Sequence, residues 1–135
     1  MKFARSVFIL AGLWGIAVLT PLFFLVDITG RPYPAPTDYP HFYYGFLAVA
    51  MAWQIGFLLI GSNPVRYRLM MIPAFIEKAG YIITTAVLYS QARISAADAN
   101  TAVPDSLLLA LFVVAFVKTR ASGPTDLPRK TFGSA

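Results

Sequence analysis

Long apolar segments separated by short polar ones dominate this chain. The pattern predicts four helices at about residues 7–26, 41–61, 69–89 and 103–118. A helix needs roughly 20 consecutive apolar residues to cross the hydrocarbon core of a bilayer. We therefore expect an all-α fold, an integral membrane bundle of four transmembrane helices that forms a single domain over residues 1–120. The last segment, residues 121–135, is rich in Pro, Gly, Ser and Thr, and we expect it to be a disordered cytoplasmic tail.

The composition supports a membrane protein and argues against several functional classes. Hydrophobic residues make up 58% of the chain and charged residues 13%, against about 25% charged residues in a typical soluble domain. The chain has no cysteine and one histidine, so thiol catalysis is excluded and we expect no metal and no cofactor. No catalytic motif is recognisable, and an enzyme is not favoured.

Basic residues predict the orientation of the helices. They flank the first helix, occupy the turn between the second and third, and follow the fourth: Lys2, Arg5, Arg66, Arg68, Lys118, Arg120, Arg129 and Lys130. Under the positive-inside rule, both termini and the middle turn are cytoplasmic, in what we expect to be a bacterial inner membrane. The net charge of +5 then reflects topology and anionic headgroups at Arg66, Arg68, Lys118 and Arg120, and not nucleic acid.

The adjacent charges Glu77 and Lys78 stand inside the apolar segment 69–89. An ionisable residue within a membrane span marks a functional site by default. Neighbouring side chains on a helix point about 100° apart, so we expect the two not to pair. Because side chains lean toward the helix N-terminus, we expect Lys78 to reach the cytoplasmic headgroups and Glu77 to face the bundle.

Pro73 leaves a second interpretation of Glu77 open. If Pro73 kinks the third helix, Glu77 lies deep in the bundle. If Pro73 belongs to the first helical turn, Glu77 is an early helical residue near the interface, where the helix dipole favours a carboxylate. In the first alternative Glu77 is part of a functional site, and in the second it only stabilises the start of the helix.

Few other polar residues occur within the predicted spans. Gln54 falls at a depth similar to that of Glu77, about 12–15 Å from the cytoplasmic boundary at 1.5 Å per residue, so we expect the amide to meet the carboxylate. Tyr81 and Thr84 share the helix face of Glu77. These residues predict a pocket with Gln54, Glu77, Tyr81 and Thr84 as ligand-binding groups.

Small residues and outer polar residues provide two further hypotheses. Ala11 and Gly15, with Gly12 beside them, form a small-xxx-small pattern that lets another helix approach closely. Asp27, His41 and Asp105 all fall at the expected outer face, where they form one polar mouth if they converge. The alternatives are helix-start chemistry for Asp105 and an interfacial role for His41.

Several short segments resemble the EXPERA superfamily, the emopamil-binding-protein and sigma-two-receptor group of sterol-handling membrane proteins. They are residues 22–27, Tyr39-Pro40, Ala52-Trp53-Gln54, Arg68 with Pro73-Ala74, and Thr84-Thr85. The resemblance implies four spans with cytoplasmic ends and a lipid-lined pocket in which Asp27 is a polar anchor. The acidic residue of the family's second helix falls near Ala50, and the His/Glu set of its sterol isomerases is missing, so isomerase activity is not implied. The chain also looks like many uncharacterised small bacterial four-span proteins.

These observations lead to one expected function and two alternatives. We expect binding of a lipid-like or isoprenoid molecule in a pocket among the first three helices. The first alternative is an accessory subunit or assembly factor of a larger membrane complex, which includes homo- or hetero-oligomers. The second is a proton-coupled small transporter in which Glu77 takes up and releases the proton.

Overall fold

The computed structural model describes the backbone of residues 2–29 and 40–119, and the side chains of these residues except 25–29. Every regular element in these ranges is helical. The elements are α1 (Lys2–Thr29), α2 (Pro40–Ser62), the 3-10 turn η1 (Arg68–Met70), α3 (Met71–Ser90), the short α4 (Ala96–Ala99) and α5 (Ala102–Lys118). The predicted all-α class is confirmed.

Four segments of the described chain are long and apolar enough to cross a membrane: Lys2–Phe24, Pro40–Ser62, Arg68–Ser90 and Ala96–Lys118, each of 23 residues. They correspond to the four predicted helices. The largest differences are at the starts of the first and fourth spans: α1 begins at Lys2 rather than near Val7, and the fourth span includes the short α4 from Ala96. Hydropathy marks the apolar part of a helix, whereas Lys2 and Arg5 extend the same helix in a polar first turn.

Pro73 lies in the first turn of α3 and does not kink it. The helix begins at Met71 and follows the 3-10 turn directly. In the first turn the missing N–H of proline costs no intrahelical hydrogen bond. Of the two alternatives that the sequence leaves open, Pro73 as part of the helix start is the observed one, yet Glu77 still faces a cavity between the helices.

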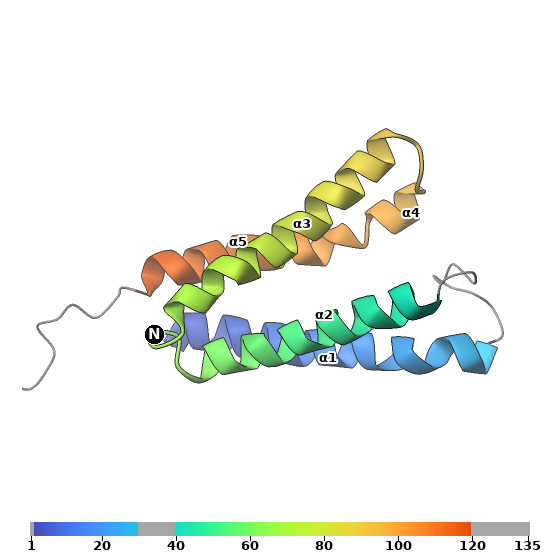
Figure 1. Cartoon of the computed structure of the whole chain (residues 1–135). Coiled ribbons are helices and arrows are strands. Elements are labelled where there is room, and N and C mark those ends of the chain that lie inside the picture. The colour runs from blue at the N-terminus through green and yellow to red at the C-terminus, as the bar shows by residue number, and fades with distance from the viewer. Residues whose placement is uncertain (1, 30–39, 120–135) are drawn as a thin grey trace, which may run out of the picture.

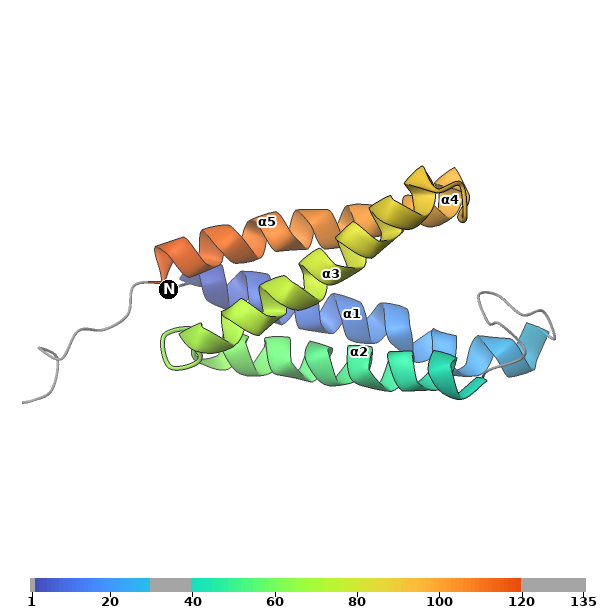
Figure 2. The ribbon, with the colours of Figure 1, turned by 45° about the horizontal axis from the view of Figure 1, so that its top comes forward.

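The helices form two antiparallel hairpins. One consists of α1 and α2, which pack along each other, and the other of α3 and α5. Figures 1 and 2 show that the hairpins approach each other at the end where the N-terminus lies and separate toward the opposite end. The closed end is called the base here, and the opposite end the open end.

Aromatic packing closes the base. Phe8, Phe57 and Phe112, from α1, α2 and α5, are completely buried. The ring centroid of Phe112 lies 4.3 Å from that of Phe8 and 5.0 Å from that of Phe57. Each ring buries a large apolar area and the pairs add favourable edge and stacking contacts. This cluster joins the two hairpins.

Arg68 fastens the end of α5 to the start of α3. Its side chain donates to the carbonyl oxygens of Thr119 and Phe116, and its guanidinium carbon lies 3.7 Å from the ring centroid of Phe116. The last carbonyls of a helix have no intrahelical partner, so a cation there is favourable. Arg68 therefore holds two helices together, in addition to the headgroup role that its position predicts.

Candidate ligand-binding cavity between the hairpins

The space between the hairpins is a cavity of about 1050 Å³. Residues of α1, α2, α3, α4 and α5 line it, so it is not confined to the first three helices. Apolar side chains such as Trp14, Phe46 and Leu108 form most of its wall. Its polar lining comes mainly from α3 and the start of α5 and comprises Gln54, Glu77, Lys78, Tyr81, Thr84, Thr85, Asp98, Thr101 and Asp105.

A three-residue charge cluster lies in this polar wall. The ammonium of Lys78 lies 2.8 Å from Asp105 Oδ1 and 3.3 Å from Glu77 Oε2. The Lys78 side chain is only 7% exposed, and its Nζ lies 5.4 Å from the centroid of the Phe57 ring. A buried ammonium needs such partners, because removing it from water is costly.

The structure corrects two expectations about Lys78. Its side chain is buried beside Asp105 instead of reaching outward from the helix bundle, and it does contact Glu77. The expectation considered α3 alone, whereas the position of Lys78 depends on α5, which places Asp105 beside it. The contact with Glu77 is weaker, since its hydrogen-bond distance from Nζ to Oε1 is 3.4 Å.

One carboxylate oxygen of Glu77, Oε2, is buried without a hydrogen bond, although the Lys78 ammonium is nearby. Buried polar atoms are nearly always hydrogen-bonded, and an exception calls for an explanation. Glu77 also lines the cavity, so its carboxylate belongs to the polar wall, while Oε2 itself is covered and lies beside the Lys78 ammonium.

Tyr81 and Thr101 continue the polar wall toward the open end. The two hydroxyl groups are 2.8 Å apart, and Thr101 also donates to the carbonyl of Asp98. Tyr81 follows Glu77 by one helical turn, as the spacing predicts. Thr84 lines the cavity as well.

Gln54 lines the cavity but does not bond to Glu77. Its Nε2 donates to the carbonyl of Ala50 at 3.1 Å, and its side chain lies against Gly15, where an added Cβ would overlap it. The expected amide–carboxylate hydrogen bond is therefore absent. The similar depth of Gln54 and Glu77 along their helices does bring both residues to one cavity. It does not determine the direction of either side chain.

The small residues of α1 lie where the two helices of the first hairpin are closest. Ala11 is 2% exposed. A Cβ on Gly12 would come within 2.8 Å of the backbone oxygen of Gln54, and one on Gly61 would approach Ile9. These positions allow α1 and α2 to approach closely.

The residues expected at an outer mouth are not seen together. Asp105 contacts Lys78 inside the cavity. The centroid of the His41 ring lies 4.4 Å from that of the Phe42 ring, and His41 does not line the cavity. The described part of the structure does not include the side chain of Asp27 or any atom of Arg120. Lys78, Asp98 and Thr101 join the lining without having been predicted. The sequence signal for Asp98 was its place three residues after Ser95, since the two form a capping box.

The polar wall offers hydrogen-bonding and charged groups but no metal-binding cluster of His, Cys, Asp or Glu within the described residues. Comparison with known proteins adds no relative, since no family model, curated protein or solved structure matches the chain.

Proposed function

We propose that this chain is an integral membrane protein that binds a lipid-like or isoprenoid amphiphile in the cavity between its hairpins. The observation that carries the proposal is the cavity itself, with apolar walls on most sides and one polar wall around Glu77. Binding sites for small molecules usually combine a mostly apolar lining with a few placed polar groups.

The ligand is an amphiphile with a small hydrogen-bond-donating head. Its apolar body lies against Trp14, Phe46 and Leu108, and its head lies against the polar wall that contains Glu77, Tyr81 and Thr84. The volume of about 1050 Å³ is at the upper end of ordinary ligand pockets, which hold roughly 300–1,000 Å³. The resemblance to the EXPERA superfamily would add Asp27 as a second polar anchor.

The same proposal places the base of the bundle at the cytoplasmic face of a bacterial inner membrane. The basic residues Lys2, Arg66 and Lys118 support this orientation, since they belong to the ends of spans that meet at the base. The cavity then opens toward the outer leaflet.

Two glycines allow a matched test of ligand binding. Gly80 on α3 lines the cavity, and a Cβ there meets no atom within 4 Å. Gly45 on α2 is equally free of neighbours but does not line the cavity. Gly80→Trp should therefore extend into the cavity from a Cβ that meets no neighbour, and Gly45→Trp should leave the cavity open.

Each variant would be purified from native membranes in mild detergent, and its bound small molecules quantified by mass spectrometry. We expect a bound amphiphile with the unchanged chain and with Gly45→Trp, and a loss of most of it with Gly80→Trp. Equal retention by both variants would refute the cavity as the binding site. Co-purification of a protein, without an amphiphile, would favour the accessory-subunit role instead.

A further inference from the structure

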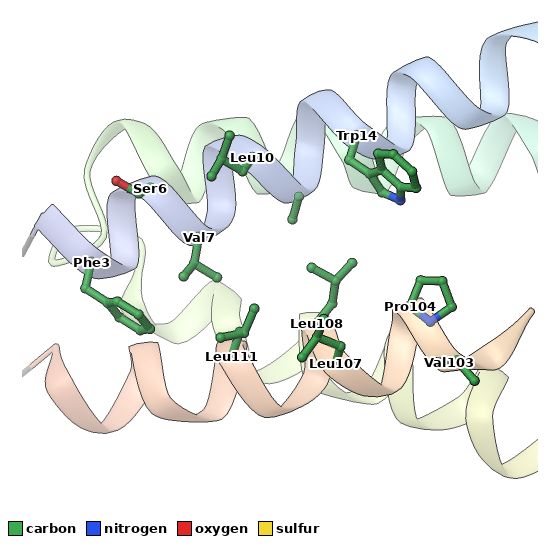
Figure 3. Close-up of a pocket in the computed structure, with 11 residues that line it drawn as sticks. Phe3, Ser6, Val7, Leu10, Trp14, Val103, Pro104, Leu107, Leu108 and Leu111 are labelled. Carbon is green, nitrogen blue, oxygen red and sulfur yellow. The ribbon is translucent and has the colours of Figure 1, made fainter.

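A second hollow lies between α1 and α5, and it adjoins the cavity between the hairpins, with which it shares Ala11, Trp14, Pro104 and Leu108. It has a volume of about 730 Å³, and its wall is apolar except for Ser6. The lining residues are Phe3, Ser6, Val7, Leu10, Ala11 and Trp14 of α1 with Val103, Pro104, Leu107, Leu108 and Leu111 of α5. Figure 3 shows Val7 and Trp14 directed toward α5, and Leu108 and Leu111 of α5 facing them. This hollow is called the α1–α5 groove here.

The groove has the length of one membrane leaflet. Phe3 and Trp14 mark its ends on α1, and the eleven residue steps between them, at 1.5 Å each, amount to about 16.5 Å. Half of a hydrocarbon core of about 30 Å is about 15 Å. An acyl chain from the leaflet at the base therefore matches the groove from end to end.

Positive charge collects at the base end of the groove. The ammonium of Lys118 lies 4.6 Å from the centroid of the Phe3 ring, and the exposed Lys2 precedes Phe3 directly. The sequence has no Asp or Glu in residues 1–26 or 106–125, so no acidic residue of α5 after Asp105 or of α1's groove-lining part offsets these charges. The cavity between the hairpins differs, since it contains three carboxylates.

From this geometry we infer that the α1–α5 groove binds an anionic phospholipid of the bilayer. One acyl chain lies along the groove, and the phosphate bonds to Lys118 and Lys2. The charge at the base end selects the anionic headgroup, because a basic residue near an anionic membrane surface contributes roughly 1 kcal/mol. The site rests on the proposed insertion in a membrane but not on ligand binding in the hairpin cavity.

The test uses the full chain in mild detergent, incubated with equal amounts of phosphatidylglycerol and phosphatidylcholine that carry the same acyl chains. Native mass spectrometry then counts each lipid retained. We expect phosphatidylglycerol to be preferred. Lys118→Gln should reduce that preference about five-fold, the factor that corresponds to one basic residue. Arg93→Gln removes an exposed basic residue that follows α3 and does not line the groove, and it should leave the preference unchanged.

Two apolar positions of equal exposure separate groove binding from general lipid contact. Leu107 lines the groove and Ile83 on α3 does not, and both are 62% exposed. Leu107→Trp should fill the groove and reduce retention of both lipids, whereas Ile83→Trp should not. Gly80→Trp should leave phosphatidylglycerol retention unchanged, so a failure of the hairpin-cavity proposal is distinguishable from a failure of this one.

Three outcomes would overturn the inference. The first is equal retention of the two lipids by the unchanged chain, which indicates ordinary surrounding lipid. The second is retention that Leu107→Trp does not alter. The third is a dimer that holds no lipid and dissociates in Leu107→Trp, which would make the groove an interface between two copies of the chain.

Discussion

At the scale of single residues, Lys78 is the one charged residue among the buried side chains of the described chain. Its ammonium lies in a mostly apolar surrounding, against the Phe57 ring, and is compensated by Asp105 at 2.8 Å and Glu77 at 3.3 Å. Breaking a buried ion pair by removing one partner leaves an uncompensated charge and is strongly destabilising. The shorter distance makes Asp105 the principal partner.

Lys78→Met should therefore lower the free energy of unfolding in detergent by about 3 kcal/mol, the usual order for a buried pair that loses one partner. The physical reason is that Asp105 would keep its charge without the ammonium. Lys78→Met combined with Asp105→Leu removes both charges and should recover a large part of this loss. Denaturant unfolding followed by circular dichroism gives the free energy of unfolding of the unchanged protein, the single variant and the double variant.

Glu77→Gln provides the control for this pair. Glu77 contributes only the longer contact, and one of its oxygens accepts no hydrogen bond, so we expect the fold to tolerate the amide with little loss. A double variant as unstable as Lys78→Met alone would show that the Lys78–Asp105 pair is not the source of the stability.

At the scale of elements, α1 and α2 pack through glycines whose neighbours differ in kind. A Cβ on Gly12 would come within 2.8 Å of the backbone oxygen of Gln54, whereas one on Gly15 would meet only the Gln54 side chain. A backbone atom moves only if the helix moves, but a glutamine side chain is able to rotate. Gly45 of the same hairpin has no atom within 4 Å.

Three alanine substitutions test this packing. Gly12→Ala should cost about 2 kcal/mol of stability, within the range of about 1–3 kcal/mol for overpacked sites. Gly15→Ala should cost less and should displace Gln54. Gly45→Ala should be neutral or stabilise by up to about 1 kcal/mol through helix propensity. Thermal unfolding in detergent ranks the variants, and a Gly15→Ala variant less stable than Gly12→Ala would contradict the close backbone approach of α1 and α2 at Gly12.

The sequence predicts these elements well because hydropathy and small-residue spacing are local properties. The four apolar runs and the small residues Ala11 and Gly15 are visible without knowledge of the fold. The partner of Lys78 is not, since Asp105 is 27 positions away and comes near it only when α3 and α5 pack. The partner of Gln54 is not visible in the sequence either, because it depends on how the side chain rotates. In the structure Gln54 donates to the Ala50 carbonyl and not to Glu77.

At the scale of the whole molecule, the bundle is asymmetric along its length. Phe8, Phe57 and Phe112 fill the space between the helices near the base, whereas a cavity of about 1050 Å³ lies between the hairpins. The hairpins separate toward the open end, as Figure 2 shows. The function of the cavity thus depends on which end faces the cytoplasm.

The orientation is testable because the chain has no cysteine, so a single introduced thiol is the only one present. Ser62 at the end of α2 and Ser95 before α4 are both exposed, and they lie at opposite ends of α3. With both termini cytoplasmic, Ser95→Cys should react with a membrane-impermeant maleimide added to intact bacterial cells. Ser62→Cys should react only after the membrane is permeabilised. The reverse result would contradict the orientation and place the cavity's opening at the cytoplasmic leaflet, while labelling of both in intact cells would contradict insertion itself.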